Sequence, residues 1–499
     1  MAFPPVALWY PVFGGYSEQQ IETLRQDKEL LELSQSQDVI SDPLGSIITR
    51  PGFSAVRASV ITGSPTITGL HWMQDLVDSL ILTASDGKVY QDSINPPAEI
   101  TGGTAFASGA TVLTRGAVFN NLLILTTTSR NIPRTLDSAL TLADLGGTPA
   151  RGVDVKAFAR RVCMFSPSDG TTTYRSIMSF NSANDNQAAW TTPYTTNFLN
   201  FGRTGTDVNV LGGEHYKDHL MAFTEDRAYP IYATPNATLP LAFQDSLFSE
   251  DGGGPGNIHG VVAANERLYW LSRNRDVKFL FQGLMSSIGY PVQPFLRGLT
   301  DAQLTNIVGG WEPKYRMVVW AMADAGSATH NVVLALHVDT KQFHLHTLSR
   351  NAFTNRIVSG QQRLIGGGLA GLFYNEYDTS LTGNADNAAT AIDADIMTPR
   401  LHLGLPDVTK KCPYVAVQFD PIGTEAVTVQ YQLDDSQTWT SFLESPFTMS
   451  GTDKRIAYFT IPAPFEDIRL RFRDAIASDR YRIVRFGFPK PLALTVGRN

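Results

Sequence analysis

The sequence predicts an all-β protein, in which a β-propeller of about six blades with an N-terminal helix is followed by a C-terminal β-sandwich domain. Three observations predict this fold. Apolar strand cores recur along the chain at a nearly regular spacing. The 41 glycines and 28 prolines are typical of many short strands joined by tight turns. Two strand-turn-strand units of one design also follow each other between Leu211 and Leu299, which indicates a repeat architecture.

The N-terminal part contains the one predicted helix. Ser17 and Gln20, three residues apart, form a capping box at the start of the segment 18–33. Its apolar stripe consists of Ile21, Leu24, Leu30 and Leu31. We therefore assign residues 1–40 to an arm and place the start of the propeller at residue 41.

The propeller is predicted over residues 41–378. Strand cores begin near six markers that lie 40 to 58 residues apart, and a four-stranded blade takes about 40 to 50 residues. The markers are Leu80, Leu122, Val162, Leu220, Leu268 and Met317. A seventh core near Leu364 closes or follows the ring, so the predicted blade number is six, give or take one. The longest interval contains the polar and aromatic stretch 181–201, which we interpret as a surface loop.

The two similar hairpins are interpreted as parts of neighbouring blades. The first, over 219–232, turns at Glu225-Asp226-Arg227, and the second, over 268–280, has a slightly longer polar turn. Between them lies a loop that contains Gly252-Gly253-Gly254-Pro255-Gly256, which no helix or strand interior accommodates. Because this loop lacks the Gly-Lys-Ser/Thr ending of a phosphate-binding loop, we predict a connector.

A second domain is predicted after a polar connector. Residues 379–395 form the connector, and residues 396–499 form the β-sandwich. Apolar and polar residues alternate over 415–419, 426–432 and 468–473, as expected for strands with one buried face.

Composition limits the functional classes. The formal net charge of −7 gives no reason to expect tight, sequence-independent binding to phosphates, which needs clustered Lys and Arg. The two cysteines, Cys163 and Cys412, provide neither a disulfide framework nor a cysteine-rich zinc site, and we expect both to be buried in a reducing compartment. Because the N-terminus lacks a basic leader and no apolar run is long enough to span a membrane, we expect a soluble, unsecreted protein without membrane insertion.

Three arginines share one face of a predicted C-terminal strand and alternate with apolar residues on the other face. They are Arg469, Arg471 and Arg473. Three aligned guanidinium groups suit the carboxylates of a neighbouring subunit or the phosphates of DNA. The alternative, which we favour, is a half-exposed strand whose arginines pair with Asp467 or Asp474 and are otherwise solvated.

His344 and His346 also share one face of a predicted strand, a spacing compatible with two metal ligands. No third ligand is evident, because His337 and Asp339 lie across a predicted turn. We therefore predict no metal site and a packed or solvated histidine pair.

Sequence motifs of common enzyme classes are absent. The chain contains no Gly-x-Ser-x-Gly elbow, His-Glu-x-x-His helix or Cys-x-x-Cys pair. We therefore predict no catalytic residues, no cofactor and no enzymatic activity. The segment 434–439 has a poor similarity to the Asp-box turns of sialidase-type propellers, because it lacks the usual glycine and occurs once. We interpret it as a hairpin turn in which Asp and Ser side chains cap backbone amides and Trp439 packs inward.

The order of features around the two hairpins allows a family comparison. The first hairpin ends in Tyr229 and Tyr232, and the glycine-rich loop leads to Asn257-Ile258-His259-Gly260. The second hairpin is followed by Val292-Gln293-Pro294-Phe295 and by a short predicted helix, Thr300-Asp301-Ala302-Gln303-Leu304.

Near the N-terminus, Asp42-Pro43-Leu44-Gly45 leads to the arginine-proline-glycine stretch Thr49-Arg50-Pro51-Gly52-Phe53. In these features, and over most of its length, the chain resembles the tail hub, packaged-DNA stabilisation or nozzle, proteins of short-tailed bacteriophages. The resemblance implies a structural virion protein, made in the host cytoplasm, that forms a homo-hexameric ring in the tail or neck at the portal vertex. Such a ring forms the DNA exit channel, retains packaged DNA and does not catalyse a reaction.

The resemblance also implies the partners. The portal-adaptor ring lies above, tail fibre, spike or needle proteins lie below, and double-stranded DNA passes through without sequence-specific contact. A modestly acidic channel wall lets DNA slide, because each additional phosphate contact adds affinity. We expect the N-terminal helix to dock on the adaptor through Ile21, Leu24 and Leu31, because this segment is amphipathic and lies outside the blades.

Two alternatives belong to other functional classes. A carbohydrate-binding or carbohydrate-cleaving propeller, similar to a sialidase or depolymerase, needs convergent carboxylates and arginines at the centre of the ring. A non-viral propeller that serves as an interaction scaffold is expected to be a monomer.

Overall fold

The computed structural model describes most of the chain. The described residues are 6–11, 33–41, 46–73, 78–202, 208–244, 246–247, 250–378, 385–386, 390–405, 407–421, 426–448, 455–474 and 480–494. The chain folds into two compact units, which are described separately. Unit 1 comprises Met1–Ser54, Leu334–Thr347 and Glu376–Asn499, and unit 2 comprises Ala55–Val333 and Leu348–Asn375.

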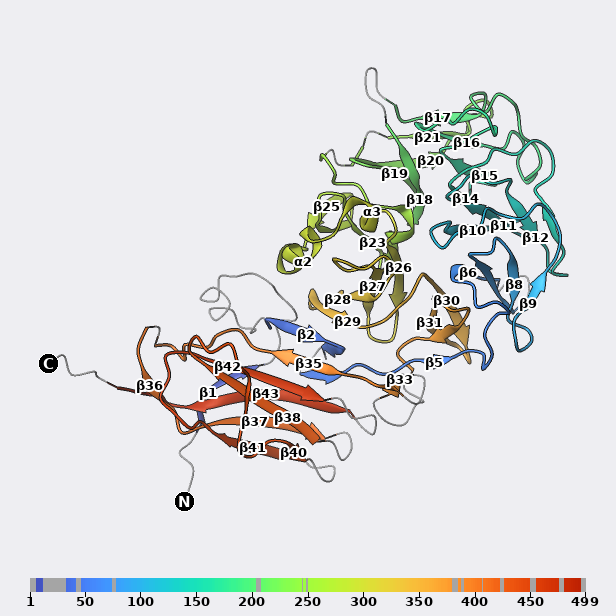
Figure 1. Cartoon of the computed structure of the whole chain (residues 1–499). Helices are drawn as coiled ribbons and strands as arrows, with labels where there is room; N and C mark the ends of the chain where they lie inside the picture. Colours follow the sequence, from blue (N-terminus) through green and yellow to red (C-terminus); the bar gives the residue numbers. More distant parts are fainter. Residues whose placement is uncertain are drawn as a thin grey trace. The chain divides into compact units, whose positions relative to one another are not determined.

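Unit 2 consists of small antiparallel sheets that follow one another in sequence order, coloured from blue through green to orange in Figure 1. Among the described residues, six sheets have four strands each, and the sixth of these consists of β30 (Ala352–Val358), β31 (Gln361–Gly367), β32 (Phe373–Asn375) and β5 (Ser54–Ala55). The first three sheets contain β6 (Ile67–Trp72), β7 (Leu80–Ala84), β8 (Val89–Gln91) and β9 (Ala98–Ile100); β10 (Thr114–Phe119), β11 (Leu122–Thr127), β12 (Arg134–Leu136) and β13 (Leu142–Asp144); and β14 (Asp154–Phe158), β15 (Arg161–Phe165), β16 (Ile177–Phe180) and β17 (Phe198–Asn200).

The remaining elements of unit 2 continue this order. The next two four-stranded sheets contain β18 (Val210–Tyr216), β19 (His219–Thr224), β20 (Ala228–Ala233) and β21 (Leu241–Phe243); and β22 (Val262–Ala264), β23 (Arg267–Leu271), β24 (Val277–Phe281) and β25 (Leu284–Ser287). They are followed by the pair β26 (Val308–Glu312) and β27 (Met317–Met322), and by β30 (Ala352–Val358), β31 (Gln361–Gly367) and β32 (Phe373–Asn375). The short helices are η1 (Ile258–Gly260), η2 (Tyr290–Val292), α2 (Gln293–Arg297) and α3 (Asp301–Leu304), and β5 (Ser54–Ala55) lies at the boundary of the two units.

The first strands of successive sheets form a closed ring. β6, β10, β14, β18, β22, β26 and β30 contact one another in this order, and β30 in turn contacts β6. Four-stranded antiparallel sheets repeated around a common axis are the architecture of a β-propeller. The structure therefore supports the predicted β-propeller within an all-β chain.

Each predicted strand core lies in the second strand of one sheet. The predicted cores fall in β7, β11, β15, β19, β23, β27 and β31. Every residue of β7, β15 and β27 is buried. A strand that is covered on both faces gives a continuous apolar run in the sequence, which explains why these segments were predictable.

The two similar hairpins are β19–β20 and β23–β24, and they belong to consecutive sheets, as predicted. Their apolar side chains share one core, in which the rings of Phe223 and Trp270 lie 5.6 Å apart between centroids. The short helix predicted from Thr300 is α3, and Thr300 and Gln303 form its capping box.

The stretch 181–201, predicted as a surface loop, is partly structured. Its end forms β17, the fourth strand of its sheet, and the side chain of Tyr194 is buried against the core between two sheets. A three-residue strand is too short to show the alternation on which the prediction depended.

Unit 1 contains two larger sheets. In strand order, one sheet consists of β3 (Val39–Ser41), β4 (Ile47–Thr49), β43 (Tyr481–Pro489), β37 (Tyr414–Pro421) and β41 (Arg455–Thr460), with β1 (Val6–Pro11) on β43. The other contains β28 (Val332–His337), β29 (Gln342–His346), β2 (Gln35–Gln37), β35 (Ala394–Met397), β42 (Ile468–Asp474), β38 (Ala426–Leu433) and β39 (Thr440–Ser441), with β40 (Phe447–Thr448) on β38. Two smaller pairs are β33 (Ala385–Asp386) with β34 (Thr390–Ala391), and β36 (Lys410–Lys411) with β44 (Leu492–Ala493).

Both sheets of unit 1 contribute to one apolar core. Phe419 comes from one sheet and Phe472 from the other, and Leu33 and Val39 from the N-terminal part are also completely buried in this core. The predicted arm, 1–40, thus contributes strands to the same unit as the C-terminal residues. No local sequence pattern indicates this pairing, because strands can pair across any sequence separation.

The predicted helix lies almost entirely outside the described residues. Of the segment 18–33, the structure describes Leu33 alone. The candidate adaptor contacts Ile21, Leu24 and Leu31 therefore also lie outside the described residues, and their role stays a prediction. In the part of the chain that is described, no helix is long and apolar enough to cross a membrane.

Candidate functional site

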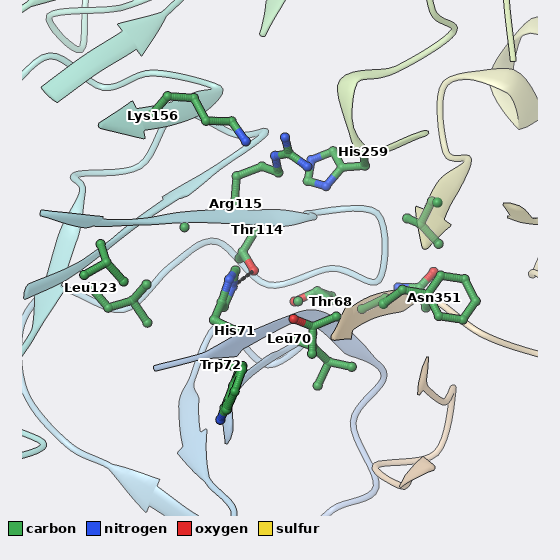
Figure 2. Close-up of a pocket in the computed structure, with 18 residues that line it drawn as sticks. Thr68, Leu70, His71, Trp72, Thr114, Arg115, Leu123, Lys156, His259 and Asn351 are labelled. Carbon is green, nitrogen blue, oxygen red and sulfur yellow. Dashed lines mark hydrogen bonds between the residues drawn. The ribbon is translucent and has the colours of Figure 1, made fainter. Parts of the chain in front are cut away.

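The centre of unit 2 contains a cavity of about 290 Å³. Figure 2 shows this cavity and the side chains around it. Its wall is formed mainly by first strands, which contribute His71 from β6, Arg115 from β10, Lys156 from β14 and Phe353 from β30, and by His259 from η1.

Glycines on the first strands allow these close contacts. A Cβ atom at Gly69 would overlap the hydroxyl oxygen of Thr114, and one at Gly116 would lie 2.9 Å from Nδ1 of His71. The strands therefore approach the axis closely, and the cavity is narrow and lined by side chains.

Four charged residues form a network at one side of the cavity. Nε of Arg115 donates to Asp154 at 3.1 Å, and Nη2 of Arg115 donates to Glu214 at 2.7 Å. Nζ of Lys156 donates to the same oxygen of Glu214 at 2.9 Å. Burial by itself raises the pKa of Glu214, but the charges of Lys156 and Arg115 outweigh it and lower that pKa to about 2.

The two cations line the cavity, whereas the two carboxylates do not. Arg115 and Lys156 are part of the wall, and neither Asp154 nor Glu214 is. Asp154 is completely buried and accepts hydrogen bonds from the backbone N–H groups of Val155 and Gly213, both at 2.8 Å. Backbone donors thus share in compensating this buried negative charge.

The two histidines of the cavity wall are neutral at pH 7. Burial and the charge of Arg115 lower the pKa of His71 to about 3, and burial lowers the pKa of His259 well below its usual value. A nitrogen of His71 lies 3.1 Å from the hydroxyl oxygen of Thr114. Nε2 of His259 is buried and has no hydrogen-bond partner among the described residues.

Sequence reasoning missed this network. Asp154 and Lys156 alternate on one strand, and Arg115 and Glu214 lie in the first strands of two other sheets. Charged residues inside strands of an otherwise apolar pattern are the signal that was available. Only the ring of first strands brings the four residues together.

A second cavity, of about 670 Å³, lies among loops of unit 2. Its wall includes both hairpin turns and the glycine-rich loop, and Nη1 of Arg273 from the second turn pairs with Glu225 from the first at 2.9 Å. Arg275 pairs with Asp301 at 2.8 Å, and Arg227 pairs with Asp226 at 3.4 Å. Each arginine of this cavity is therefore engaged by a carboxylate.

The three arginines predicted as contacts lie side by side on β42 in unit 1. Arg471 forms three hydrogen bonds with Asp395, of 2.9, 3.2 and 2.5 Å, and Arg473 pairs with Asp393 at 2.6 Å. Arg469 donates to the hydroxyl oxygen of Ser34 at 3.1 Å. This face is a half-exposed strand with paired arginines, as in the favoured alternative. The partners differ from the predicted Asp467 and Asp474: Asp393 directly precedes β35, and Asp395 lies in it.

Trp439 differs from its predicted position. Instead of packing inward, its half-buried ring lies 5.7 Å from the guanidinium groups of both Arg469 and Arg471. This geometry is that of a cation–π contact, which stabilises aromatic side chains at a surface. Of the predicted caps, the hydroxyl of Ser436 does accept a hydrogen bond from the N–H of Thr438 at 3.3 Å.

The histidine pair of unit 1 is packed and hydrogen-bonded. Both ring nitrogens of His344 lie 2.7 Å from hydroxyl oxygens, those of Ser36 and Ser41. The nitrogens of His346 lie 2.8 Å from the hydroxyl of Tyr377 and 2.9 Å from the carbonyl oxygen of Val39. Because all four nitrogens have partners, the pair holds chain segments together and is not arranged as metal ligands.

No cluster of three or more His, Cys, Asp or Glu side chains suited to a metal ion occurs among the described residues. Cys163 and Cys412 are both free and buried, as predicted. Burial raises the pKa of the Cys163 thiol to about 12, so this thiol is uncharged at neutral pH.

The fold and the central cavity define a β-propeller protein. No known family model matches the chain, and no curated protein is similar to it. Among solved structures, the computationally designed Ika8 protein is similar at 12% identity and a TM-score of 0.38, covering 64% of this chain and 98% of that one. A structure described as YCF48 bound to D1 peptide is similar at 10% identity and a TM-score of 0.39, covering 66% and 97%.

Proposed function

We propose that this chain is a structural virion protein of a short-tailed bacteriophage. Copies of it form a ring in the tail or neck, below the portal and its adaptor, that encloses the DNA exit channel. The ring retains packaged DNA and attaches distal tail parts. The proposal rests on the resemblance to tail hub proteins, and one observation supports it. Several residues on which the resemblance is based form hydrogen bonds or ion pairs between segments that are far apart in the sequence.

Asn257 is one such residue. Its side chain accepts from the N–H of His259, which caps η1, and donates to the carbonyl oxygens of Thr305 and Ile307 at 2.7 and 2.9 Å. It therefore joins the segment before β22 to the segment before β26. The N–H of Gly254, in the glycine-rich loop, donates to the backbone carbonyl oxygen of Glu225 in the first hairpin turn, and a Cβ atom at Gly254 would overlap that turn.

Arg50, of the arginine-proline-glycine stretch, has the same role in unit 1. Its side chain is 2% exposed and pairs with Asp38 at 2.6 Å and with Asp386 at 2.7 Å. Asp38 also accepts from the N–H of Thr347 at 3.0 Å. One buried guanidinium thus links segments that are far apart in the sequence.

The central cavity is too small for double-stranded DNA. A cavity of about 290 Å³ holds roughly ten water molecules at ~30 Å³ each. The major groove of B-form DNA alone is about 12 Å wide. We therefore propose that DNA passes along an axis between copies of the chain and that six copies enclose it.

We further propose the finer architecture. The seven first strands in the ring correspond to seven blades, one more than the central value of the sequence prediction. Unit 1, with its two sheets around one core, corresponds to the predicted β-sandwich, completed by strands from the N-terminal residues.

The carbohydrate-active alternative has less support. A glycoside hydrolase needs two carboxyl groups that face the bound sugar. The described lining of the central cavity contains no Asp or Glu, and the nearby charge network holds Asp154 and Glu214 in ion pairs with Arg115 and Lys156. A glycan cleavage screen with the purified protein is expected to show no activity.

Electron microscopy of negatively stained protein tests the ring. We expect six-fold rings, alone or on addition of the portal-adaptor complex. Analytical ultracentrifugation of the same samples measures the oligomer mass. A protein that stays monomeric even beside portal and adaptor contradicts the proposal and favours the scaffold alternative.

A variant tests docking on the adaptor. In Ile21→Ser/Leu24→Ser/Leu31→Ser, the apolar stripe of the N-terminal segment is lost, and co-sedimentation with portal-adaptor complexes is expected to decrease at least ten-fold. The matched control is Leu443→Ser, because Leu443 is already 93% exposed and lies outside this segment. Equal binding by both variants contradicts the docking role.

A further inference from the structure

We propose that the central cavity of unit 2 is a binding site for a small oxyanion, of the size of phosphate or of a short carboxylate. This site goes beyond the proposed virion role and does not depend on it. Arg115 and Lys156 are the residues that bind the anion.

The orientation of the charges is the first argument. Figure 2 shows Arg115 and Lys156 on the same side of the cavity, next to His259. Their carboxylate partners do not line the cavity, so an anion inside it meets the two cations first. Electrostatic attraction decreases with distance, and the pairing carboxylates reduce the attraction without abolishing it.

The unused donors are the second argument. Nε and Nη2 of Arg115 bind Asp154, Glu214 and the carbonyl oxygen of Gly213, but Nη1 makes no hydrogen bond with any described residue. Nζ of Lys156 has three N–H donors and one described acceptor, Glu214. A guanidinium and an ammonium with free N–H groups are the usual partners of phosphate and carboxylate oxygens.

An unpartnered buried nitrogen is the third argument. His259 is 8% exposed and lines the cavity, and its Nε2 has no hydrogen-bond partner among the described residues. Leaving a buried polar atom unpaired costs about 1 to 3 kcal/mol. A bound anion that accepts from the neutral imidazole after a small rearrangement removes this cost.

The size and polarity of the cavity set the class of ligand. A volume of about 290 Å³ accommodates a phosphate ion with several waters, but not a nucleic acid strand. The other polar wall residues are neutral: the amide of Asn351 donates to the carbonyl oxygens of Ile67 and Ala110, each at 3.1 Å. The site therefore selects by charge and size.

Thermal unfolding with added sodium phosphate tests the proposal. At constant ionic strength, maintained with sodium chloride, we expect phosphate to raise the melting temperature in a saturable way, because the folded state alone binds it. A parallel series with sodium glutarate distinguishes phosphate from carboxylate selectivity. No rise with either anion overturns the proposal.

Matched variants locate the site. Lys156→Met removes the ammonium group but keeps the apolar stem, and we expect it to weaken phosphate binding at least ten-fold. Lys88→Met is the control, because Lys88 is an exposed partner of Glu99. Equal phosphate binding by both variants places the ion elsewhere and contradicts the assignment.

A measurement on the unmodified protein covers the case in which Lys156→Met does not fold. Phosphorus NMR of inorganic phosphate is expected to show line broadening when the full-length protein is added, and sulfate is expected to reverse it. Unchanged line width with well-folded protein overturns the proposal.

Discussion

At the residue scale, the central network shows how buried charges are tolerated. Glu214 accepts from both Arg115 and Lys156, and Asp154 accepts from Arg115 and from two backbone N–H groups. Every charge therefore has an opposite charge or a hydrogen bond. Removing one partner leaves the others buried without compensation, which costs more than the pair itself contributes.

Glu214→Gln is expected to lower the free energy of unfolding of unit 2 by about 2 to 3 kcal/mol, because Arg115 and Lys156 lose their shared anion. Urea denaturation followed by tryptophan fluorescence measures the change. Glu99→Gln, at the exposed Lys88–Glu99 pair, is the control and is expected to have little effect. Equal effects of the two substitutions contradict the role of the network.

The pH dependence of stability follows from the pKa of Glu214. This pKa is about 2 in the folded protein and 4.5 in its usual state. A lowered carboxyl pKa contributes stability that is complete above pH 4.5 and is lost as the pH falls toward 2. We therefore expect the difference in urea midpoint between the wild type and Glu214→Gln to decrease on acidification through this window. A difference that stays constant with pH indicates that the substitution acts through packing and not through the charge of Glu214.

At the element scale, the ring of sheets closes where β30 meets β6. Residues from β6–β8 and from β30–β32 share one apolar core. A partly buried ion pair adds to it: Nη1 of Arg356, on β30, lies 3.0 Å from the buried carboxylate of Asp92, which follows β8. Asp92 also accepts from the N–H of Leu80 at 2.8 Å, so its carboxylate joins the two sheets directly.

Asp92→Ala is expected to destabilise unit 2 by about 3 kcal/mol, because it leaves Arg356 and the N–H of Leu80 without their buried acceptor. Asp78→Ala is the matched control: Asp78 pairs with the same arginine at 3.6 Å but is 75% exposed. Urea denaturation of both variants tests the closure. A larger loss in Asp78→Ala than in Asp92→Ala excludes this explanation.

The elements that were predictable from the sequence are those covered on both faces. Strands such as β7 and β27 are continuous apolar runs, and their spacing indicated the repeat. Short outer strands such as β17 were not predictable, because three residues carry no periodicity. The face of β42 was predictable from the alternation, whereas Asp393 and Asp395, which neutralise it, come from a distant part of the sequence.

At the scale of the whole molecule, the proposed role next to DNA bears on the net charge and on the arginine face of β42. The net charge is −7, and Arg471 and Arg473 are paired with carboxylates. In the proposed channel, paired arginines would let DNA slide, because counterion release drives DNA binding only where cations are free to contact phosphates.

Asp393→Asn/Asp395→Asn is expected to convert this surface into a DNA-binding one. It frees two arginines, so the affinity for duplex DNA should increase and the slope of log K against log salt should become steeper by about 2. Fluorescence anisotropy at several salt concentrations measures both. Adding Arg471→Gln/Arg473→Gln should reverse the gain; a gain that persists arises at another surface.

The sequence by itself determined the all-β class, the repeat of buried second strands and the pairing of two similar hairpins in consecutive sheets. These properties depend on local patterns, because a buried strand must be apolar and a tight turn needs particular residues. Only the tertiary structure decided that Leu33 and Val39 join the C-terminal core and that Arg115, Asp154, Lys156 and Glu214 form one ion-pair network. Such contacts depend on which strands become neighbours, and no pattern within one strand specifies its partners.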